Sequence, residues 1–407
     1  MPLIRPFAGL RPLPEYAEDV VAPPYDVLSS EEARERAAGK PMSFLHISKA
    51  EIDLPEDVDP YDPSVYAKAA ENLNKLIKQG VLIRDTAPRY YVYQLIMGDH
   101  VQTGLVAAAS VKDYDSNRIR KHEFTRPAKE DDRVRQIEAL NAQTGPVLLA
   151  YKSDDEIDTI LAEVTKGQPV YDLVADDGIG HRFWVVEDQP IIDKLTSGFD
   201  AMDAIYIADG HHRSASASRV AKSIGGSDEL MSHYFLSVIF PHNQMKIFDY
   251  NRVVTDLNGL NKADFLTKLE GSFSCIKESA PVRPAKPTEF GMYLDGEWYR
   301  LNIKAELVPE DPVASLDVSL LADNLLEPIL GISDPRTDPR IDFVGGIRGL
   351  EGLEKRVNSG EMAVAFSLYP TSMEALMAVA DANEVMPPKS TWFEPKLADG
   401  LVSHMLD

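Results

Sequence analysis

Three turn sequences flanked by apolar segments of strand length constrain the fold of this 407-residue chain most. Glycine and aspartate populate these turns because both tolerate the backbone angles that tight hairpins need. The turns and their flanks are Gly98-Asp99 between 89–97 and 101–111, Asp176-Asp177-Gly178 between 170–174 and 182–186, and Asp295-Gly296 between 290–294 and 298–303. Each of these patterns predicts a hairpin. Along the whole chain the predicted strands outnumber the long helices and their order is mixed, so we expect an α+β fold rather than a regular alternation of strands and helices.

The remaining elements follow from apolar periodicity and end signals. A helix is expected over 63–80, because its apolar residues recur at helical spacing between Asp62-Pro63 and Gly80. Further helices are predicted over 211–223, 312–330 and 372–383, and further strands over 43–48, 146–152, 204–208, 234–240 and 363–369. At this length we expect two or three domains, predicted as an N-terminal segment (1–100), a core (101–245) and a C-terminal α+β domain (246–407).

Composition limits the classes of partner. With 42 basic and 65 acidic residues the net charge is −23, which disfavours nucleic acid as a partner. No apolar run approaches the roughly 20 residues that span a membrane, and the first residues lack the apolar stretch of a signal peptide. Cys275 is the only cysteine, so an internal disulfide is impossible. Together these features predict a soluble, cytoplasmic protein.

The most informative segment is a predicted strand followed by Asp209, Gly210, His211, His212 and Arg213 at the start of a predicted helix. The N-terminus of a helix exposes N–H groups and the positive end of the dipole, so it binds anions. Glycine permits close approach of a ligand, and histidine and arginine add donors for phosphate oxygens. Asp209 is a candidate metal ligand. Inert histidines beside a turn are the alternative.

A second segment, residues 118–135, is a basic island. It carries seven basic and four acidic residues, for a charge of +3 within a strongly acidic chain. Such an island favours capture of a small anion. His122, Glu123 and Arg126 precede the predicted helix and are candidate site residues. For Arg133, a solvated helix face remains an equal alternative.

Two proline-rich loops carry weaker candidates. Tyr25 and Asp26 follow two prolines, and Lys389 follows Pro387-Pro388. Rigid loops often present binding groups, although many are only structural. Elsewhere, the sequence excludes a P-loop and a zincin motif, because the glycines and the second histidine are missing.

Five segments identify a resemblance to a family of roughly 400-residue prokaryotic proteins known as a domain of unknown function. These segments are RPFAGLRP (5–12), APPYDVLS (22–29), HEFTRP with EDDR (122–133), DGHHR (209–213) and VMPPKSTWFEPK (385–396). They are spread over nearly all of the chain.

The centre also resembles the ParB/sulfiredoxin superfamily, and within it the free-serine kinases. They share an H-E pair (His122-Glu123), a helix with an early arginine (Arg133) and D-G-H-H-R (209–213). The resemblance implies a ParB/sulfiredoxin-like core elaborated by N- and C-terminal α/β segments, with an insertion near 170–186. Sulfiredoxin chemistry itself is excluded, because position 211 is His where that chemistry needs a cysteine.

The implied activity is that of a kinase that phosphorylates the hydroxyl of free L-serine to give O-phosphoserine. Glu123 would accept the hydroxyl proton with His122 orienting it, and Asp209 with Mg²⁺ would clamp the donor phosphates together with Gly210, His211, His212, Arg213 and Arg126. Pyrophosphate, ADP and ATP all suit such a loop, with the resemblance favouring pyrophosphate. Tyr25, Asp26, Arg133 and Lys389 are the weaker substrate-binding candidates. The alternative is a nucleotide-binding switch or regulatory protein without kinase activity.

Overall fold

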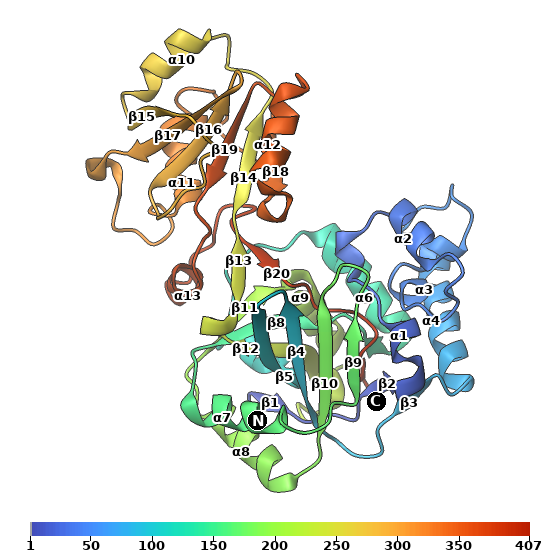
Figure 1. Ribbon diagram of the computed structural model, residues 1–407. Helices are drawn as coiled ribbons and strands as arrows, with labels where there is room; N and C mark the ends of the chain where they lie inside the picture. The colour runs from blue at the N-terminus through green and yellow to red at the C-terminus, as the bar shows by residue number, and fades with distance from the viewer. Residues whose placement is uncertain (1) are drawn as a thin grey trace. The chain divides into compact units, whose positions relative to one another are not determined.

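The computed structural model describes residues 2–407, which form two compact units (Figure 1). The first unit comprises Met1–Met245 together with Pro395–Asp407, and the second comprises Lys246–Glu394. The chain therefore leaves the first unit, builds the second and returns. Within the described residues, no helix is both long enough and apolar enough to cross a membrane.

A mixed nine-stranded sheet organises the first unit. Its order is β6-β11-β8-β12-β5-β4-β10-β9, with β1 also pairing with β5. The bounds are β1 Ile4–Arg5, β4 Tyr90–Met97, β5 His100–Ser110, β6 Ile119–Arg120, β8 Val147–Tyr151, β9 Tyr171–Val174, β10 Gly180–Val186, β11 Ile205–Asp209 and β12 Tyr234–Pro241. β12 runs parallel to β8 and β11 parallel to β6, while the other neighbours are antiparallel. The hairpin β9–β10 extends the sheet at one edge.

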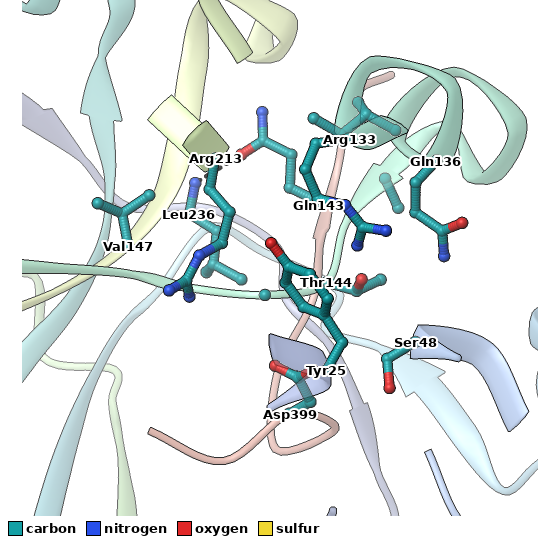
Figure 2. A pocket seen from close by; sticks show the side chains of 13 residues that line it. Tyr25, Ser48, Arg133, Gln136, Gln143, Thr144, Val147, Arg213, Leu236 and Asp399 are labelled. Atoms are coloured by element: carbon teal, nitrogen blue, oxygen red, sulfur yellow. Dashed lines mark hydrogen bonds between the residues drawn. The ribbon is translucent and has the colours of Figure 1, made fainter. Parts of the chain in front are cut away.

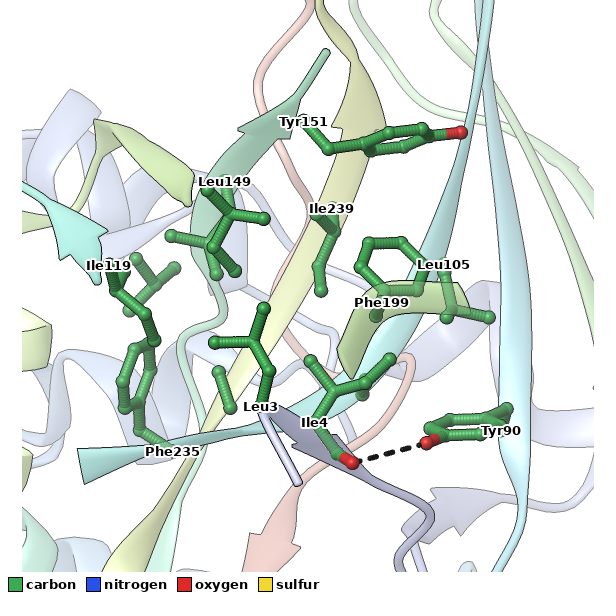
Figure 3. Packing of buried hydrophobic residues seen from close by; sticks show 14 of the residues in the cluster. Leu3, Ile4, Tyr90, Leu105, Ile119, Leu149, Tyr151, Phe199, Phe235 and Ile239 are labelled. Atoms are coloured by element: carbon green, nitrogen blue, oxygen red, sulfur yellow. Dashed lines mark hydrogen bonds between the residues drawn. The ribbon is translucent and has the colours of Figure 1, made fainter. Parts of the chain in front are cut away.

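One large hydrophobic core forms between this sheet and helices α7 and α8. Leu105, Leu149 and Ile239 from three adjacent strands meet Phe199 from α8 there (Figure 3). β1 closes the core, and the Tyr90 hydroxyl donates a hydrogen bond to the carbonyl of Ile4. Burial of these apolar side chains supplies the driving force that fixes β11 and β8 in place.

The described part of the first unit contains nine α-helices. They are α1 Ala17–Val20, α2 Ser30–Ala37, α3 Leu45–Ser48, α4 Pro63–Lys78, α5 Val111–Asp115, α6 Pro127–Leu140, α7 Asp155–Val164, α8 Gln189–Asp200 and α9 His211–Ile224. The N-terminal helices α2, α3 and α4 share a second core, in which Leu73 and Leu76 of α4 belong to the same cluster as Leu140 of α6. α6 also packs beside α9.

Two short strand pairs complete the first unit and connect its distant segments. β2 (Leu10–Pro12) pairs with β3 (Leu82–Arg84), and β21 (His404–Met405) pairs with β7 (Ala142–Gln143). Isolated bridges also join Leu10 to Ser403 and Ala22 to Asp399. The returning segment Pro395–Asp407 is thus held against the N-terminal region and against the strand before β8.

The second unit is an antiparallel sheet of order β15-β17-β16-β19-β14-β18. Its strands are β13 Lys246–Phe248, β14 Tyr250–Val254, β15 Phe273–Glu278, β16 Glu289–Leu294, β17 Glu297–Ile303, β18 Ile341–Gly345, β19 Val364–Leu368 and β20 Trp392–Glu394, with β13 and β20 forming a separate pair. Its helices are α10 Lys262–Leu269, α11 Asp317–Leu321, α12 Gly349–Asn358 and α13 Met373–Asp381. Leu353 and Val357 of α12 pack on the sheet.

The α+β expectation is confirmed, and all three predicted hairpins form. Residues 45–48, predicted as part of a strand, instead form α3. The helix predicted over 312–330 is shorter, because α11 starts at Asp317 and continues into a π-helical turn, Ala322–Leu326. The N-terminal segment shares the first unit with the core, and Pro395–Asp407, placed in the C-terminal domain by the sequence, lies in that unit as well.

Candidate functional site

The site begins where β11 passes into α9. The pairing of β11 with β8 shifts register between Ile207 and Asp209, which is a bulge at the end of the strand. Bulges re-aim the side chains that follow them. Gly210 then adopts φ 100°, a left-handed conformation. A Cβ at this position would lie 3.2 Å from the Arg213 guanidinium carbon and 3.3 Å from Cα of Val147, so the conformation favours glycine and a larger residue would also be crowded.

Helix α9 presents its N-terminus directly after this turn. Gly210 is the N-cap residue, and among the described residues no side chain caps the first turn of α9. The helical hydrogen bonds begin with the Ser214 N–H donating to the Gly210 carbonyl at 3.0 Å. The N–H groups of the first turn and the helix dipole therefore favour an anion at this end. This is the location that the sequence predicted for phosphate binding.

Both histidines of α9 bind the loop that carries Glu123. The backbone N–H of His122 donates to Nε2 of His211 at 3.4 Å, and that of Arg126 donates to Nε2 of His212 at 3.0 Å. Each ring thus accepts, at its Nε2, a hydrogen bond from a different backbone N–H of the same loop. Their contacts show that these histidines position the segment before α6, a task that the sequence did not indicate.

Glu123 is held beside His211. The Nδ1 of His211 lies 3.5 Å from the Glu123 carboxylate, whose side chain is 54% exposed. Burial lowers the pKa of His211 well below its usual value, so this ring is neutral at pH 7. A neutral ring whose Nε2 accepts a hydrogen bond carries its proton on Nδ1, which therefore points at Glu123. His211 is therefore in contact with this carboxylate.

His122 lies behind the site. Its side chain is buried, and its ring packs edge-to-face on His211 with centroids 4.5 Å apart. Burial lowers the pKa of His122 to about 4, which keeps it neutral. The sequence placed His122 beside Glu123 as its orienting partner, but the His122 side chain is buried against His211 while that of Glu123 is exposed. His122 supports His211 instead.

Asp209 lies between two cations. Its carboxylate is 3.4 Å from Nη2 of Arg213 and 3.9 Å from Nζ of Lys396. Burial alone would raise the pKa of Asp209, but these cations lower it to about 2. Asp209 is therefore ionised at neutral pH. Sequence reasoning did not select Lys396 as a site residue, because its position depends on the return of Pro395–Asp407 to the first unit.

The Arg213 guanidinium lies beside Gly210, the N-cap residue of α9, and is largely buried. Nη1 donates to the carbonyl of Pro146, and Nη2 faces both Asp209 and Asp26, whose oxygen lies 3.8 Å away. The side chain is 11% exposed. These contacts commit much of its hydrogen-bonding capacity within the protein. The predicted phosphate contact by Arg213 stays a prediction.

A cavity in which the centre of a water molecule can occupy about 30 Å³ adjoins Arg213 (Figure 2). Tyr25 and Arg133 line it, and the guanidinium of Arg133 lies 4.0 Å from the centre of the Tyr25 ring. Asp399 and Ser48 also line it. The structure thus brings together Tyr25, Asp26 and Arg133 from the weaker candidates. Asp399 and Ser48 were missed, because no local motif surrounds either residue.

The other two predicted residues lie differently. Arg126 is exposed at the start of α6, and its backbone is fixed by His212. Lys389 belongs to the second unit, where its ammonium group lies 5.6 Å from the centre of the Tyr250 ring.

The fit of a metal ion depends on Asp209. Within residues 2–407, no three His, Cys, Asp or Glu side chains form a group that would hold a metal ion. Mg²⁺ bound with phosphates needs few protein ligands, and the ionised carboxylate of Asp209 is a suitable hard oxygen ligand. The residues present therefore fit an ion held mainly by phosphate oxygens and water.

Comparison with known proteins gives distant structural neighbours. A free serine kinase in complex with AMP has 14% identity and a TM-score of 0.36, over 71% of this chain and 86% of that chain. A conserved hypothetical protein from Pyrococcus furiosus has 14% identity and a TM-score of 0.35, over 72% and 94%. SbnI with C-terminal truncation from Staphylococcus aureus has 12% identity and a TM-score of 0.37, over 72% and 84%.

A search of curated proteins gives no match. A family model described as "Protein of unknown function (DUF1015)" matches residues 4–319, which is most of the chain. The RPFAGLRP, APPYDVLS, HEFTRP and DGHHR segments all lie within that range. The protein therefore belongs to the DUF1015 family.

Proposed function

We propose that the first unit transfers a phosphoryl group from pyrophosphate, ADP or ATP to the hydroxyl of a small acceptor, L-serine. One observation carries the proposal: an exposed carboxylate, Glu123, is held 3.5 Å from His211 at the first residue of α9. A candidate base thus lies next to an anion-binding helix terminus. This pairing suits phosphoryl transfer, because its catalysis consists largely of positioning and charge stabilisation.

The donor phosphates would lie at the N-terminus of α9. Backbone N–H groups of the first turn would donate to phosphate oxygens, and the exposed guanidinium of Arg126 would add charge at the edge. Gly210 leaves room for this approach. Mg²⁺, when bound with the donor, neutralises phosphate charge, and Asp209 is the carboxylate that would contact it.

The acceptor hydroxyl would lose its proton to Glu123. Its oxygen forms a bond to the transferred phosphorus while the bond from phosphorus to the leaving oxygen breaks. The leaving group is phosphate from pyrophosphate, AMP from ADP, or ADP from ATP. His211 would hold the Glu123 carboxylate during this step through its Nδ1–H.

The test is phosphorus NMR of the purified protein with L-serine, Mg²⁺ and each donor separately. We expect a new phosphomonoester signal that coincides with added O-phosphoserine and disappears when Mg²⁺ is chelated. Binding of a nucleotide without any phosphomonoester would replace this function by the nucleotide-binding switch. No binding of any donor would remove both proposals.

A further inference from the structure

The cavity beside Arg213 contains the buried carboxyl group of Asp399, which lies near the backbone N–H of Tyr25 and the guanidinium groups of Arg213 and Arg133. Asp399 is 1% exposed, and neither of its side-chain oxygens accepts a hydrogen bond of ordinary geometry from the residues that the structure describes. Leaving a buried polar group unpaired costs about 1–3 kcal/mol or more. The Oγ of Ser48, another lining atom, is also buried and unpaired within the described chain. Buried polar atoms of this kind are satisfied by a water, an ion or a bound ligand.

The opposite charge is also present in this cavity. Arg133 donates to Asp132 through Nε and Nη2, at 3.0 and 2.8 Å, so its other terminal nitrogen is not engaged by that ion pair. Its guanidinium is fixed against the Tyr25 ring, which orients it without using its donors. The cavity therefore offers a carboxyl group that accepts no hydrogen bond of ordinary geometry from the described part of the chain and a guanidinium that suits an anion.

We propose that this cavity binds the α-ammonium and α-carboxylate groups of a free amino acid, with Asp399 facing the ammonium and Arg133 facing the carboxylate. A zwitterion satisfies both groups and adds no net charge to a buried site. A ribose would offer only neutral hydroxyls to Asp399 and Arg133, with no charge to balance either group. Burial raises the pKa of Asp399 to about 7, and a bound ammonium group would favour its ionised form.

Arg213 connects the cavity with the proposed transfer site. It lines the cavity, while its Nη2 faces Asp209 at the end of β11. An amino acid in the cavity is thus separated from Asp209 by one guanidinium. The inference rests on the proposed function only in making this amino acid the phosphoryl acceptor; its binding is independent of the reaction.

Gly145 provides a way to fill the cavity without disturbing the fold. A Cβ there would lie 3.4 Å from Cδ of Arg213 and 3.6 Å from Oδ1 of Asp399, which are ordinary contact distances. Gly145→Ala therefore adds a methyl group beside the ligand position. Asp399→Asn keeps the shape of the side chain and removes its charge.

The experiment is calorimetric titration of the full chain with L-alanine, which has the two charged groups and no hydroxyl. We expect saturable binding, weakened at least about tenfold by Asp399→Asn and by Arg133→Gln, because each removes a charge-assisted contact. Gly145→Ala should weaken it as well, and melting curves should show that all variants are folded. Propionate and ethylamine, with one charge each, should bind more weakly.

Three results would overturn the inference: no binding of L-alanine or L-serine, unchanged affinity in folded Asp399→Asn and Gly145→Ala, or displacement of L-alanine by adenosine. Binding of L-alanine without phosphorylation of L-serine would support the cavity and reject the kinase. Phosphorylation of L-serine with an unchanged KM in Asp399→Asn would support the kinase and reject the cavity.

Discussion

At the scale of single residues, the candidate site depends on how neighbouring side chains orient one another. Glu123 is exposed, yet it is held by a buried, neutral His211 that is itself packed on His122. The carboxylate therefore combines solvent access with a fixed position. This arrangement makes separate predictions for the carboxylate and for the ring that holds it.

Replacing Glu123 by glutamine should abolish most of the transfer activity. Glu123→Gln preserves the side-chain shape but removes the proton acceptor, so turnover should fall at least about 10²-fold with donor affinity retained. Glu138→Gln, which alters an exposed glutamate on α6, is the matched control and should leave turnover unchanged. Full activity of Glu123→Gln in the O-phosphoserine assay would assign proton removal to another group, such as Asp26 or Asp209.

His211 should act through Glu123 rather than on the substrate. His211→Phe retains the ring but removes both nitrogens, so kcat should fall about tenfold or more while KM for the donor changes little. His211→Asn restores a donor near Nδ1 and should recover part of kcat. If the two variants lose kcat equally and melt at the same lower temperature, His211 has a purely structural role.

Asp399 should make stability depend on pH. Burial raises the pKa of this carboxyl from its ordinary value to about 7, so the folded state retains a proton that the unfolded chain loses first. Its contribution is therefore intact below about pH 4 and decreases as pH rises toward 7. Asp399→Asn should be more stable than the parent at pH 8, by at most about 4 kcal/mol, and the difference should shrink by pH 5.

Urea unfolding of both proteins at the two pH values measures this difference directly. The comparison cancels the other titrating groups, because they are shared by parent and variant. A gain that is equal at pH 5 and pH 8 would show that the Asp399 carboxyl titrates normally in the folded protein.

At the scale of elements, the passage from β11 to α9 determines the geometry of the site. Gly210→Ala should destabilise the fold and weaken donor binding, because it combines a left-handed φ of 100° with contacts at 3.2 Å. Gly80→Ala is the control: it has φ 73° and nothing within 4 Å of its Cβ, so it should show the conformational cost of about 1 kcal/mol alone. Equal melting temperatures for both variants would contradict a crowded turn.

The elements that could be predicted from sequence are those with strong local signals. Asp62-Pro63 and Gly80 marked α4, and apolar residues on either side of Asp295-Gly296 marked β16 and β17. Residues 43–48 carried a short apolar run without a period, and such runs do not distinguish a strand from the helix that forms. The hydrophobic pattern predicts local structure only where the segment is long enough for its period to repeat.

The candidate site was predictable to the same extent. The strand, Gly210 and the following helix were legible because they are contiguous. The contact of His212 with the Arg126 backbone, and the placement of Asp399 in the cavity, join residues far apart in the chain. Contacts of this kind depend on tertiary packing and leave no spacing in the sequence.

At the scale of the whole molecule, donor capture takes place against a net charge of −23. At about 0.1 M salt the Debye length is about 10 Å, so distant acids are largely screened while nearby cations such as Arg126 are not. We expect KM for the donor to rise several-fold between about 0.1 and 1 M salt, with a smaller effect on L-alanine binding. A KM that falls with salt would show that repulsion by the whole protein dominates.

The return of Pro395–Asp407 to the first unit has a consequence for biosynthesis. Asp399 and Lys396, which lie in the cavity and beside Asp209, are translated after the whole second unit. A nascent chain can therefore assemble most of the nine-stranded sheet on the ribosome, yet the cavity and the surroundings of Asp209 stay incomplete until synthesis has passed residue 399. Chains released early would lack both groups, so ligand competence arises only in finished molecules.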